Sequence, residues 1–150
     1  MLLIIKTESI MAYYWYIIII VVVGIVVFMF RRYKMFVSGI DTPDSEKLLN
    51  FSDKNFNHQI KNGIVLIDFW AEWCQPCKIQ GPIVSQLAED NNDKNVKIGK
   101  LNVEKNPKVA NMLGIRNIPT IIIFKSGKEV QRLVGLKNKK ALGKSIAELS

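Results

Sequence analysis

The chain has 150 residues, of which 49% are hydrophobic and 23% charged, so it can bury a core of ordinary domain size. Its two cysteines and one histidine exclude a zinc site of four cysteines or of two cysteines and two histidines, and also a scaffold held by several disulfides. The net charge of +8 permits a nucleic-acid or membrane-surface partner without identifying one.

The N-terminal segment, residues 1–34, contains a long apolar run. No charged residue occurs from Ser9 to Phe30, and residues 10–30 would form a helix of about 31 Å, close to the roughly 30 Å hydrocarbon core of a bilayer. Aromatic residues flank the run, as at membrane interfaces. We expect one transmembrane helix over about 10–30. The alternatives are a buried soluble helix, which would need a polar face, and a cleaved signal peptide, which has a shorter apolar run preceded by basic residues.

The charges beside the apolar run predict its orientation. Arg31, Arg32 and Lys34 follow it, whereas Lys6 is the one basic side chain before it, and a start at Met11 would remove even that. Positive charge resists translocation, so we expect the N-terminus outside and the remaining chain facing the cytoplasm. The segment contains no cysteine, which excludes lipid attachment through an N-terminal or juxtamembrane cysteine.

Residues 35–45 combine Gly, Pro, Asp and Ser and predict a linker, after which residues 46–150 alternate strand and helix patterns. The first expected strand is 46–51, followed by a helix from its N-cap Ser52 to about Lys61. The apolar run 64–70 predicts a strand covered on both faces. A helix follows, whose apolar positions are interrupted by Pro82: Ile79, Ile83, Leu87 and Ala88.

The C-terminal half continues the alternation. A strand is expected at 96–103, a short helix from Pro107 to Met112 ended by Gly114, and a buried strand at 120–124. A turn at 126–127 leads to a strand at 129–134, and a terminal helix presents one apolar face: Leu142, Ile146 and Leu149. This order predicts an α/β domain with helices on both faces of the sheet.

Both cysteines lie in one motif, Cys74-Gln75-Pro76-Cys77, between a predicted strand and a predicted helix. Backbone N–H groups and the helix dipole at a helix N-terminus stabilise a thiolate, and they lower a cysteine pKa from about 8.5 to roughly 3.5–7.5. Two intervening residues place both sulfurs on the first turn, so one can attack a substrate disulfide and the other can resolve the mixed disulfide. The alternatives are half of a zinc site and a pair of inert core thiols.

The sequence around this motif resembles the thioredoxin family. The resemblance begins in residues 68–78, DFWAEWCQPCK, and covers about 46–150. It continues in five further stretches: 100–103, 106–107, 114–116, 118–120 and 124–127. It implies the thioredoxin fold, a central mixed β-sheet flanked by helices, for residues 46–150.

The resemblance also implies roles for individual residues. Cys74 would be the exposed nucleophile and Cys77 the resolving thiol, joined as a redox-active disulfide in the oxidised form. Asp68 would be the buried proton acceptor for Cys77, and a carboxyl in so apolar a run should have a raised pKa. A bulge or an outward-facing edge position is the alternative for Asp68. Lys100 resembles the family's lysine near that Asp, and a bland surface lysine is its alternative.

Four residues would line the groove for an extended substrate strand: Trp73, Ile118, Pro119 and Gly135. By resemblance, Pro119 would follow a cis peptide bond, and core packing is the alternative role for Trp73. Gln75 and Pro76 between the cysteines would tune the redox potential, and Gln75 stands where the family usually has glycine. Asn117 replaces another frequent glycine and could narrow the groove or hydrogen-bond within it.

Taken together, these features predict a membrane-tethered thioredoxin that reduces protein disulfides, needs no bound cofactor or metal, and receives electrons from an upstream thioredoxin-type reductase. One alternative is an extracytoplasmic thiol–disulfide oxidoreductase, with a role in cytochrome maturation or disulfide isomerisation. Another is a tethered binding module whose cysteines do not react. We expect no nucleic-acid partner, no catalytic role for His58, and a solvated face for the C-terminal basic residues: Lys137, Lys139, Lys140 and Lys144.

Overall fold

The structure is a computed structural model that describes the backbone of residues 2–38 and 44–150 and the side chains of 13–32 and 44–150. The chain divides into two compact units, residues 1–39 and 40–150. The predicted linker, 35–45, lies partly outside the described residues, which do not include 39–43. Its first four residues belong to a helix rather than to a linker, because helix α1 continues to Ser38.

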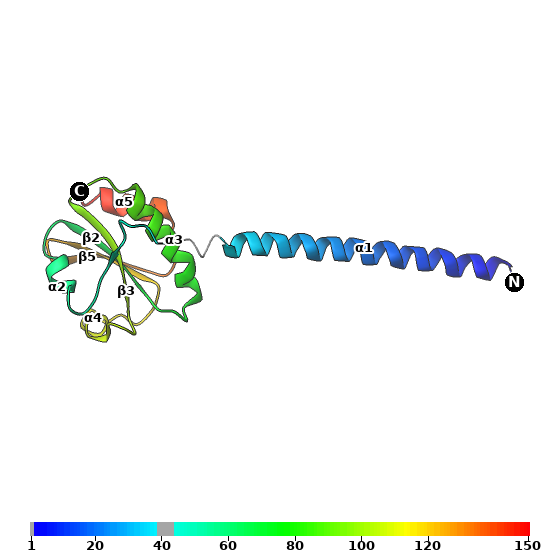
Figure 1. Cartoon of the computed structure of the whole chain (residues 1–150), viewed down its shortest axis with the longest axis horizontal. Coiled ribbons are helices and arrows are strands. Elements are labelled where there is room, and N and C mark those ends of the chain that lie inside the picture. Colours follow the sequence, from blue (N-terminus) through cyan, green and yellow to red (C-terminus); the bar gives the residue numbers. More distant parts are fainter. Residues whose placement is uncertain (1, 39–43) are drawn as a thin grey trace. The chain divides into compact units, whose positions relative to one another are not determined.

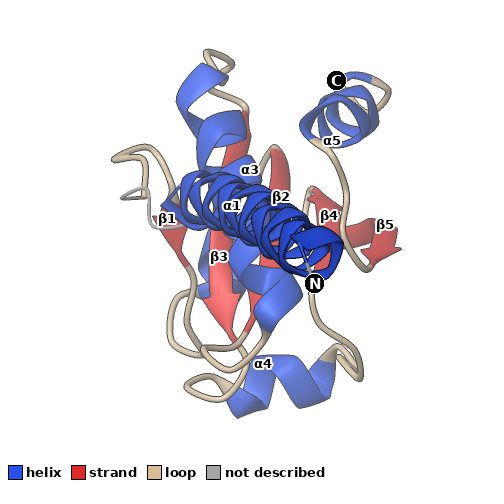
Figure 2. Cartoon of the chain, turned by 90° about the vertical axis from the view of Figure 1, so that its right-hand side faces the viewer, coloured by secondary structure: helices blue, strands red, loops and turns tan. Residues whose placement is uncertain are grey.

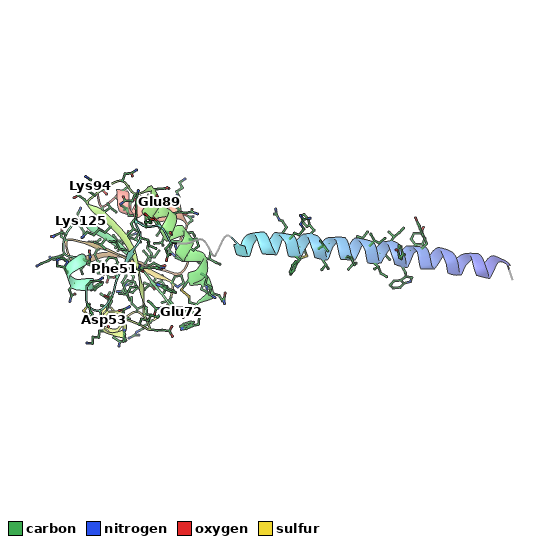
Figure 3. All side chains as sticks on the ribbon, viewed as in Figure 1. Phe51, Asp53, Glu72, Glu89, Lys94 and Lys125 are labelled. Carbon is green, nitrogen blue, oxygen red and sulfur yellow. A yellow bond between two sulfur atoms is a disulfide. The ribbon has the colours of Figure 1, made fainter. Side chains whose placement is uncertain are left out.

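The N-terminal unit is helix α1, Leu2–Ser38, which extends beyond both ends of the predicted span (Figure 1). Within it, the 20 residues Tyr13–Arg32 are long and apolar enough to cross a membrane. Every described side chain of this stretch is exposed, and Figure 3 shows them projecting outward from the helix. An apolar surface of this size needs a nonaqueous neighbour or a protein partner. The helix is thus compatible with the predicted span, and the structure does not identify what covers it.

The second unit contains a five-stranded sheet with the spatial order β1-β3-β2-β4-β5. Figure 2 shows the strands side by side in this order. β2 pairs in parallel with β3 and antiparallel with β4, while the β4–β5 hairpin supplies an antiparallel edge. The strands are β1 (Leu49–Asn50), β2 (Ile64–Trp70), β3 (Val96–Asn102), β4 (Thr120–Lys125) and β5 (Lys128–Val134). The mixed sheet confirms the predicted α/β class and the thioredoxin-type arrangement.

Helices cover both faces of this sheet and create two cores. The helices are α2 (Phe56–Gln59), α3 (Gln75–Asp90), α4 (Pro107–Met112) and α5 (Lys139–Ala147). In β2, Ile64 and Leu66 pack with α3 and α5, whereas Val65, Ile67 and Phe69 pack with α2 and α4. Figure 1 shows α3 and α5 next to each other. This double burial explains why the run 64–70 is apolar apart from Asp68.

The two predictions at the start of the domain need correction. The strand is only Leu49–Asn50, and the helix begins at Phe56 with Asn55 as its N-cap residue rather than Ser52. The reason is a turn: the Asn55 side chain accepts a hydrogen bond from the Ser52 N–H and donates one to the Asn50 carbonyl. These local bonds compete with helix formation.

Elsewhere the predicted elements agree with the structure to within one or two residues. On α3, however, Ile79 and Ile83 are only half-buried, and the helix instead buries Cys77, Gln80 and Val84. At the C-terminus, Leu142 of α5 is fully buried, and Ile146 and Leu149 pack against the same core, as expected.

Candidate active site

Cys74 and Cys77 form a disulfide at the N-terminus of α3, with their Cα atoms 5.2 Å apart. Cys74 is the N-cap residue, and its sulfur accepts a hydrogen bond of 3.2 Å from the Cys77 N–H. Pro76 occupies the first turn, where its missing N–H costs no hydrogen bond. The sequence motif therefore lies where a thiolate would be stabilised by backbone donors.

Both cysteines are buried in this oxidised form, each with 3% of its surface exposed. They form a small apolar cluster with Ala71, against which Trp70, Val103 and Ile118 pack. The expectation of an exposed Cys74 is wrong for this disulfide-bonded state, in which Cys74 lies within the cluster. Gln75 and Pro76, between them, are exposed.

Asp68 lies in the middle of the central strand and is 1% exposed, so it occupies neither a bulge nor an edge position. Its place in the alternation of β2 puts it on the sheet face that α3 and α5 cover. Burial raises the pKa of this carboxyl from 3.8 to about 7, and the nearby Lys100 cation opposes that rise. Oδ1 of Asp68 has no hydrogen-bond partner in the described part of the chain. Asp68 can therefore exchange a proton near neutral pH.

Lys100 stands opposite Asp68 in the register of β3 and β2. Its side chain is 19% exposed, and its ammonium group forms an ion pair with Asp44. The same group lies 5.3 Å from the centre of the Trp70 ring, within range of a cation–π interaction. Lys100 is thus a largely enclosed cation beside the buried carboxyl rather than a freely solvated surface residue.

Three of the predicted groove residues, Ile118, Pro119 and Gly135, lie together near the disulfide, since Ile118 packs against the cysteine cluster. The Ile118–Pro119 peptide bond is cis, as expected. The Gly135 N–H donates a 2.8 Å hydrogen bond to the Pro119 carbonyl, which ties the segment after β5 to the cis-proline. Trp73 is 66% exposed, so it is not a core residue. Asn117 uses its carbonyl to accept a hydrogen bond from the Thr120 hydroxyl.

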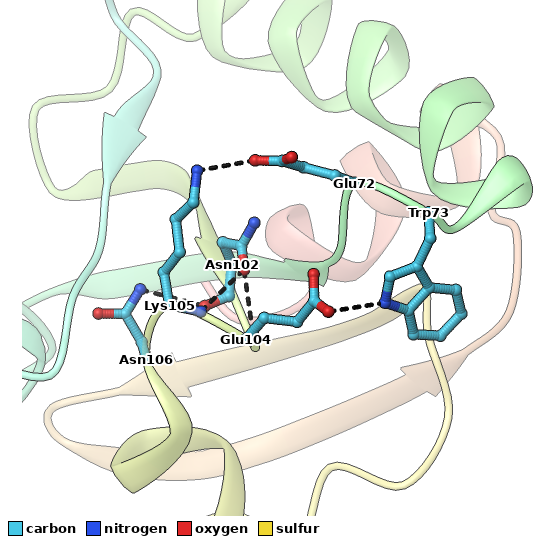
Figure 4. A network of polar contacts seen from close by, with 6 residues as sticks. All are labelled: Glu72, Trp73, Asn102, Glu104, Lys105 and Asn106. Carbon is cyan, nitrogen blue, oxygen red and sulfur yellow. Dashed lines mark hydrogen bonds and ion pairs between the residues drawn. The ribbon is translucent and has the colours of Figure 1, made fainter.

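Sequence reasoning missed the polar contacts that hold Trp73 and its loop (Figure 4). The Trp73 Nε1–H donates to a Glu104 carboxylate oxygen at 3.0 Å, and Lys105 forms an ion pair with Glu72 at 2.7 Å. The buried Asn102 organises the loop after β3 that supplies Glu104 and Lys105, because its Oδ1 accepts from the N–H groups of both residues. No local sequence pattern indicates these contacts, because the paired residues of the two loops are 31 and 33 positions apart in the chain.

Among the residues whose side chains are described, no three His, Cys, Asp or Glu side chains are grouped so that they could hold a metal ion. His58 is exposed. The site brings together the Cys74–Cys77 pair and, on the face of the sheet that α3 covers, the buried carboxyl of Asp68 beside Lys100. A dithiol pair of this kind can exchange electrons with another disulfide.

Comparison with known proteins agrees with this geometry. A sequence profile of the family described as thioredoxin matches residues 47–148. Thioredoxin from Chlorobaculum thiosulfatiphilum is 46% identical over 104 residues, covering 68% of this chain and 95% of the relative. Thioredoxin from Chlamydia caviae is 50% identical over 91 residues, covering 61% of this chain and 87% of the relative. The solved structure of a mutant thioredoxin from Halobacterium salinarum NRC-1 is similar with a TM-score of 0.62 and 31% identity, covering 71% of this chain and 94% of that one.

Proposed function

We propose that this protein is a membrane-tethered protein-disulfide reductase. The chain belongs to the thioredoxin family and is a thiol–disulfide oxidoreductase. The observation that carries the proposal is the Cys74–Cys77 disulfide at the N-terminus of α3, on the side of the sheet where Asp68 is buried. These are the only two cysteines of the chain, so any thiol chemistry must pass through them.

In the proposed reaction, the Cys74 thiolate of the reduced protein attacks one sulfur of a substrate disulfide. The substrate S–S bond breaks, one substrate sulfur leaves as a thiolate, and a mixed disulfide joins the other to Cys74. Cys77 then loses its proton to the Asp68 carboxylate and attacks the Cys74 sulfur. This forms the Cys74–Cys77 disulfide and releases the second substrate thiolate, so two electrons have passed to the substrate.

The proton step depends on the state of Asp68. A carboxyl with a pKa of about 7 is partly ionised at neutral pH and can accept a proton from a thiol and pass it on. Lys100 would keep enough of this carboxyl ionised to act as a base. Regeneration of the dithiol needs two electrons from a separate reductase of the thioredoxin-reductase type.

Substrate binding would use the surface around the disulfide. Trp73, Ile118, Pro119 and Gly135 are proposed to contact an extended strand of the substrate protein, which would pair with backbone groups there. Gln75 and Pro76 are exposed beside the sulfurs, where they would adjust the redox potential.

Tethering is proposed from helix α1. Its stretch Tyr13–Arg32 has the length and composition of a span, and Arg31 and Arg32 stand at its C-terminal end. The excess of positive charge on that side supports a single-pass protein whose thioredoxin domain faces the cytoplasm. Such a tether would restrict the enzyme to substrates at or near the membrane.

The test combines topology and chemistry in intact cells. A membrane-impermeant maleimide is applied before and after mild reduction, and lysed cells are the reference. The control for the opposite side of the membrane is a variant that lacks both native cysteines and carries a new one: Cys74→Ser, Cys77→Ser, Thr7→Cys. Cytoplasmic orientation predicts that Cys74 and Cys77 react only after lysis, whereas the thiol introduced at position 7 of the control reacts from outside. Labelling of the native cysteines in intact cells would instead support an extracytoplasmic oxidoreductase.

Substrate trapping tests the reaction itself. Replacing Cys77 with Ser removes the resolving thiol, so mixed disulfides through Cys74 should accumulate and should disappear on reduction. The Cys74→Ser variant is the matched control and should trap nothing. Equal recovery of partners with both variants would favour a binding module whose cysteines do not react.

A further inference from the structure

Gln80 is a fully buried polar side chain in the second turn of α3, three residues after Cys77. Its Oε1 accepts a 2.8 Å hydrogen bond from the Lys137 N–H, and its Nε2 donates a 3.2 Å hydrogen bond to the Lys137 carbonyl. One side-chain amide thus pairs with both backbone groups of a single residue, 57 positions away in the sequence. An apolar side chain of the same size would fill this space but would leave both groups of Lys137 unpaired.

The segment held in this way, residues 135–138, connects β5 to α5 and has no regular secondary structure. It is fixed at two points along its length. Gly135 donates to the Pro119 carbonyl at 2.8 Å, and Lys137 is held by Gln80. Leu136, between these two points, is 45% exposed, so its apolar side chain is presented to the surroundings.

The second fixed point links this segment to the helix that carries the cysteines. Cys77 and Gln80 lie one turn apart on the buried side of α3, and Ile118, which precedes Pro119, packs against the disulfide. The hydrogen bonds of Gln80 and Gly135 therefore set the position of residues 135–137 relative to both the disulfide and the cis-proline. Without the Gln80 hydrogen bonds to Lys137, the segment would keep the Gly135–Pro119 hydrogen bond but lose its link to α3.

We propose that Gln80 is a positioning residue for polypeptide substrates, because its paired hydrogen bonds to Lys137 hold residues 135–137 where an extended chain carrying a disulfide binds beside Cys74. This inference rests on the proposed function and deepens it. A polypeptide would contact the 135–137 segment, whereas a small disulfide needs access only to the sulfur of Cys74. The two substrate classes should therefore respond differently when Gln80 changes.

The test uses the full chain, reduced in advance and held in detergent micelles. Its dithiol is oxidised by excess insulin or by excess bis(hydroxyethyl) disulfide, and the rate of thiol loss is measured with each. In Gln80→Met, the rate constant with insulin should fall about tenfold, while that with the small disulfide should change less than about twofold. Faster hydrogen exchange of the Lys137 amide would show that the hydrogen bond has been lost.

Gln80→Glu supplies a rescue that depends on pH. A protonated Glu has one acceptor oxygen and one O–H donor, so it can reproduce both bonds, whereas the ionised form loses the donor and buries a charge. Relative to wild type at the same pH, the insulin rate of Gln80→Glu should be near normal in acid and should fall as the pH rises. Gln80→Met should show no such recovery. This comparison also serves if Gln80→Met fails to fold.

Asn138→Ala is the matched control, since Asn138 caps α5 through a 2.8 Å hydrogen bond from the Ala141 N–H and leaves the Gln80–Lys137 pair intact. It should keep the ratio of the two rates at the wild-type value. Equal loss with both substrates in Gln80→Met, or an unchanged insulin rate despite faster exchange at Lys137, would overturn the positioning role. A wild-type protein that reacts with neither substrate would instead overturn the proposed function and this inference together.

Discussion

Asp68 and Lys100 are register partners on the parallel strands β2 and β3, a buried carboxyl beside a cation that is 19% exposed. Parallel neighbours in register have side chains on the same face of the sheet, here the face covered by α3. Two opposing effects act on the pKa of the Asp68 carboxyl: burial favours the neutral acid, whereas Lys100 favours the carboxylate.

The stability of the protein should fall as the pH rises through the range in which Asp68 titrates. The pKa of this carboxyl is 3.8 when unfolded and about 7 when folded, so between these values the folded protein binds more protons than the unfolded chain. The free energy of unfolding from this group therefore declines from about pH 4 to about pH 7, by up to about 4 kcal/mol. Asp68→Asn should remove this decline and should unfold with about 2–4 kcal/mol more free energy than wild type at pH 8.

Denaturant unfolding of the oxidised full chain in detergent at pH 5 and pH 8 measures this effect. Glu72→Gln is the control, since Glu72 is an exposed carboxylate near the same site and should leave the pH dependence as it is in wild type. The prediction fails if wild type and Asp68→Asn respond equally to pH. Because Asp68 is also the proposed base, the same variant should exchange disulfides more slowly at neutral pH.

Replacing Lys100 should move the titration of Asp68 upward. The Lys100 cation lowers the pKa of this carboxyl, so Lys100→Met should raise it above 7 and shift the decline in stability to higher pH. Lys97→Met is the matched control on the same strand. Its ammonium group donates to the carbonyl of Gln59, the last residue of α2, and Lys97 is not among the groups that shift the pKa of Asp68. Identical pH profiles for the two variants would contradict the influence of Lys100 on Asp68.

Trp73 should contribute to substrate binding far more than to stability. Its side chain is 66% exposed, and its indole N–H bonds to Glu104, so Trp73→Ala should change the free energy of unfolding by less than about 1 kcal/mol. The KM for a polypeptide disulfide should rise roughly tenfold if the ring lines the groove. Met112→Ala, a similarly exposed apolar residue on α4, should leave this KM unchanged. An unchanged KM in Trp73→Ala would remove Trp73 from the proposed groove.

Two glycines should respond to alanine in opposite directions. A Cβ at Gly99 would meet the Leu49 carbonyl and the Phe51 ring, so Gly99→Ala should destabilise the protein by about 3 kcal/mol through overpacking. Gly81 lies inside α3, where an added Cβ would meet no atom within 4 Å beyond its chain neighbours and the backbone of its own helix, and Gly81→Ala should stabilise by about 0.5–1 kcal/mol. Thermal unfolding of both variants checks the pair. Similar shifts in the same direction would contradict the close approach of β1 to β3.

Local chemistry makes part of this fold predictable from the sequence. The run 64–70 had to be a strand buried on both faces because it offers no polar side apart from Asp68, and that one exception identified a carboxyl with a raised pKa. The end of β1 and the start of α2 were not predictable in this way. The turn at Ser52–Asn55 depends on side-chain hydrogen bonds that compete with an equally plausible helix cap.

The order of residues along the chain was enough to show that two cysteines share one redox motif, that one carboxyl lies in an apolar strand, and that an apolar segment of bilayer length precedes them. These are properties of neighbouring residues, and spacing alone reveals them. Two other contacts became visible only in the folded domain: Glu104 holds Trp73, and Gln80 holds Lys137. They join residues 31 to 57 positions apart, and strand register and helix packing, which no local pattern encodes, bring them together.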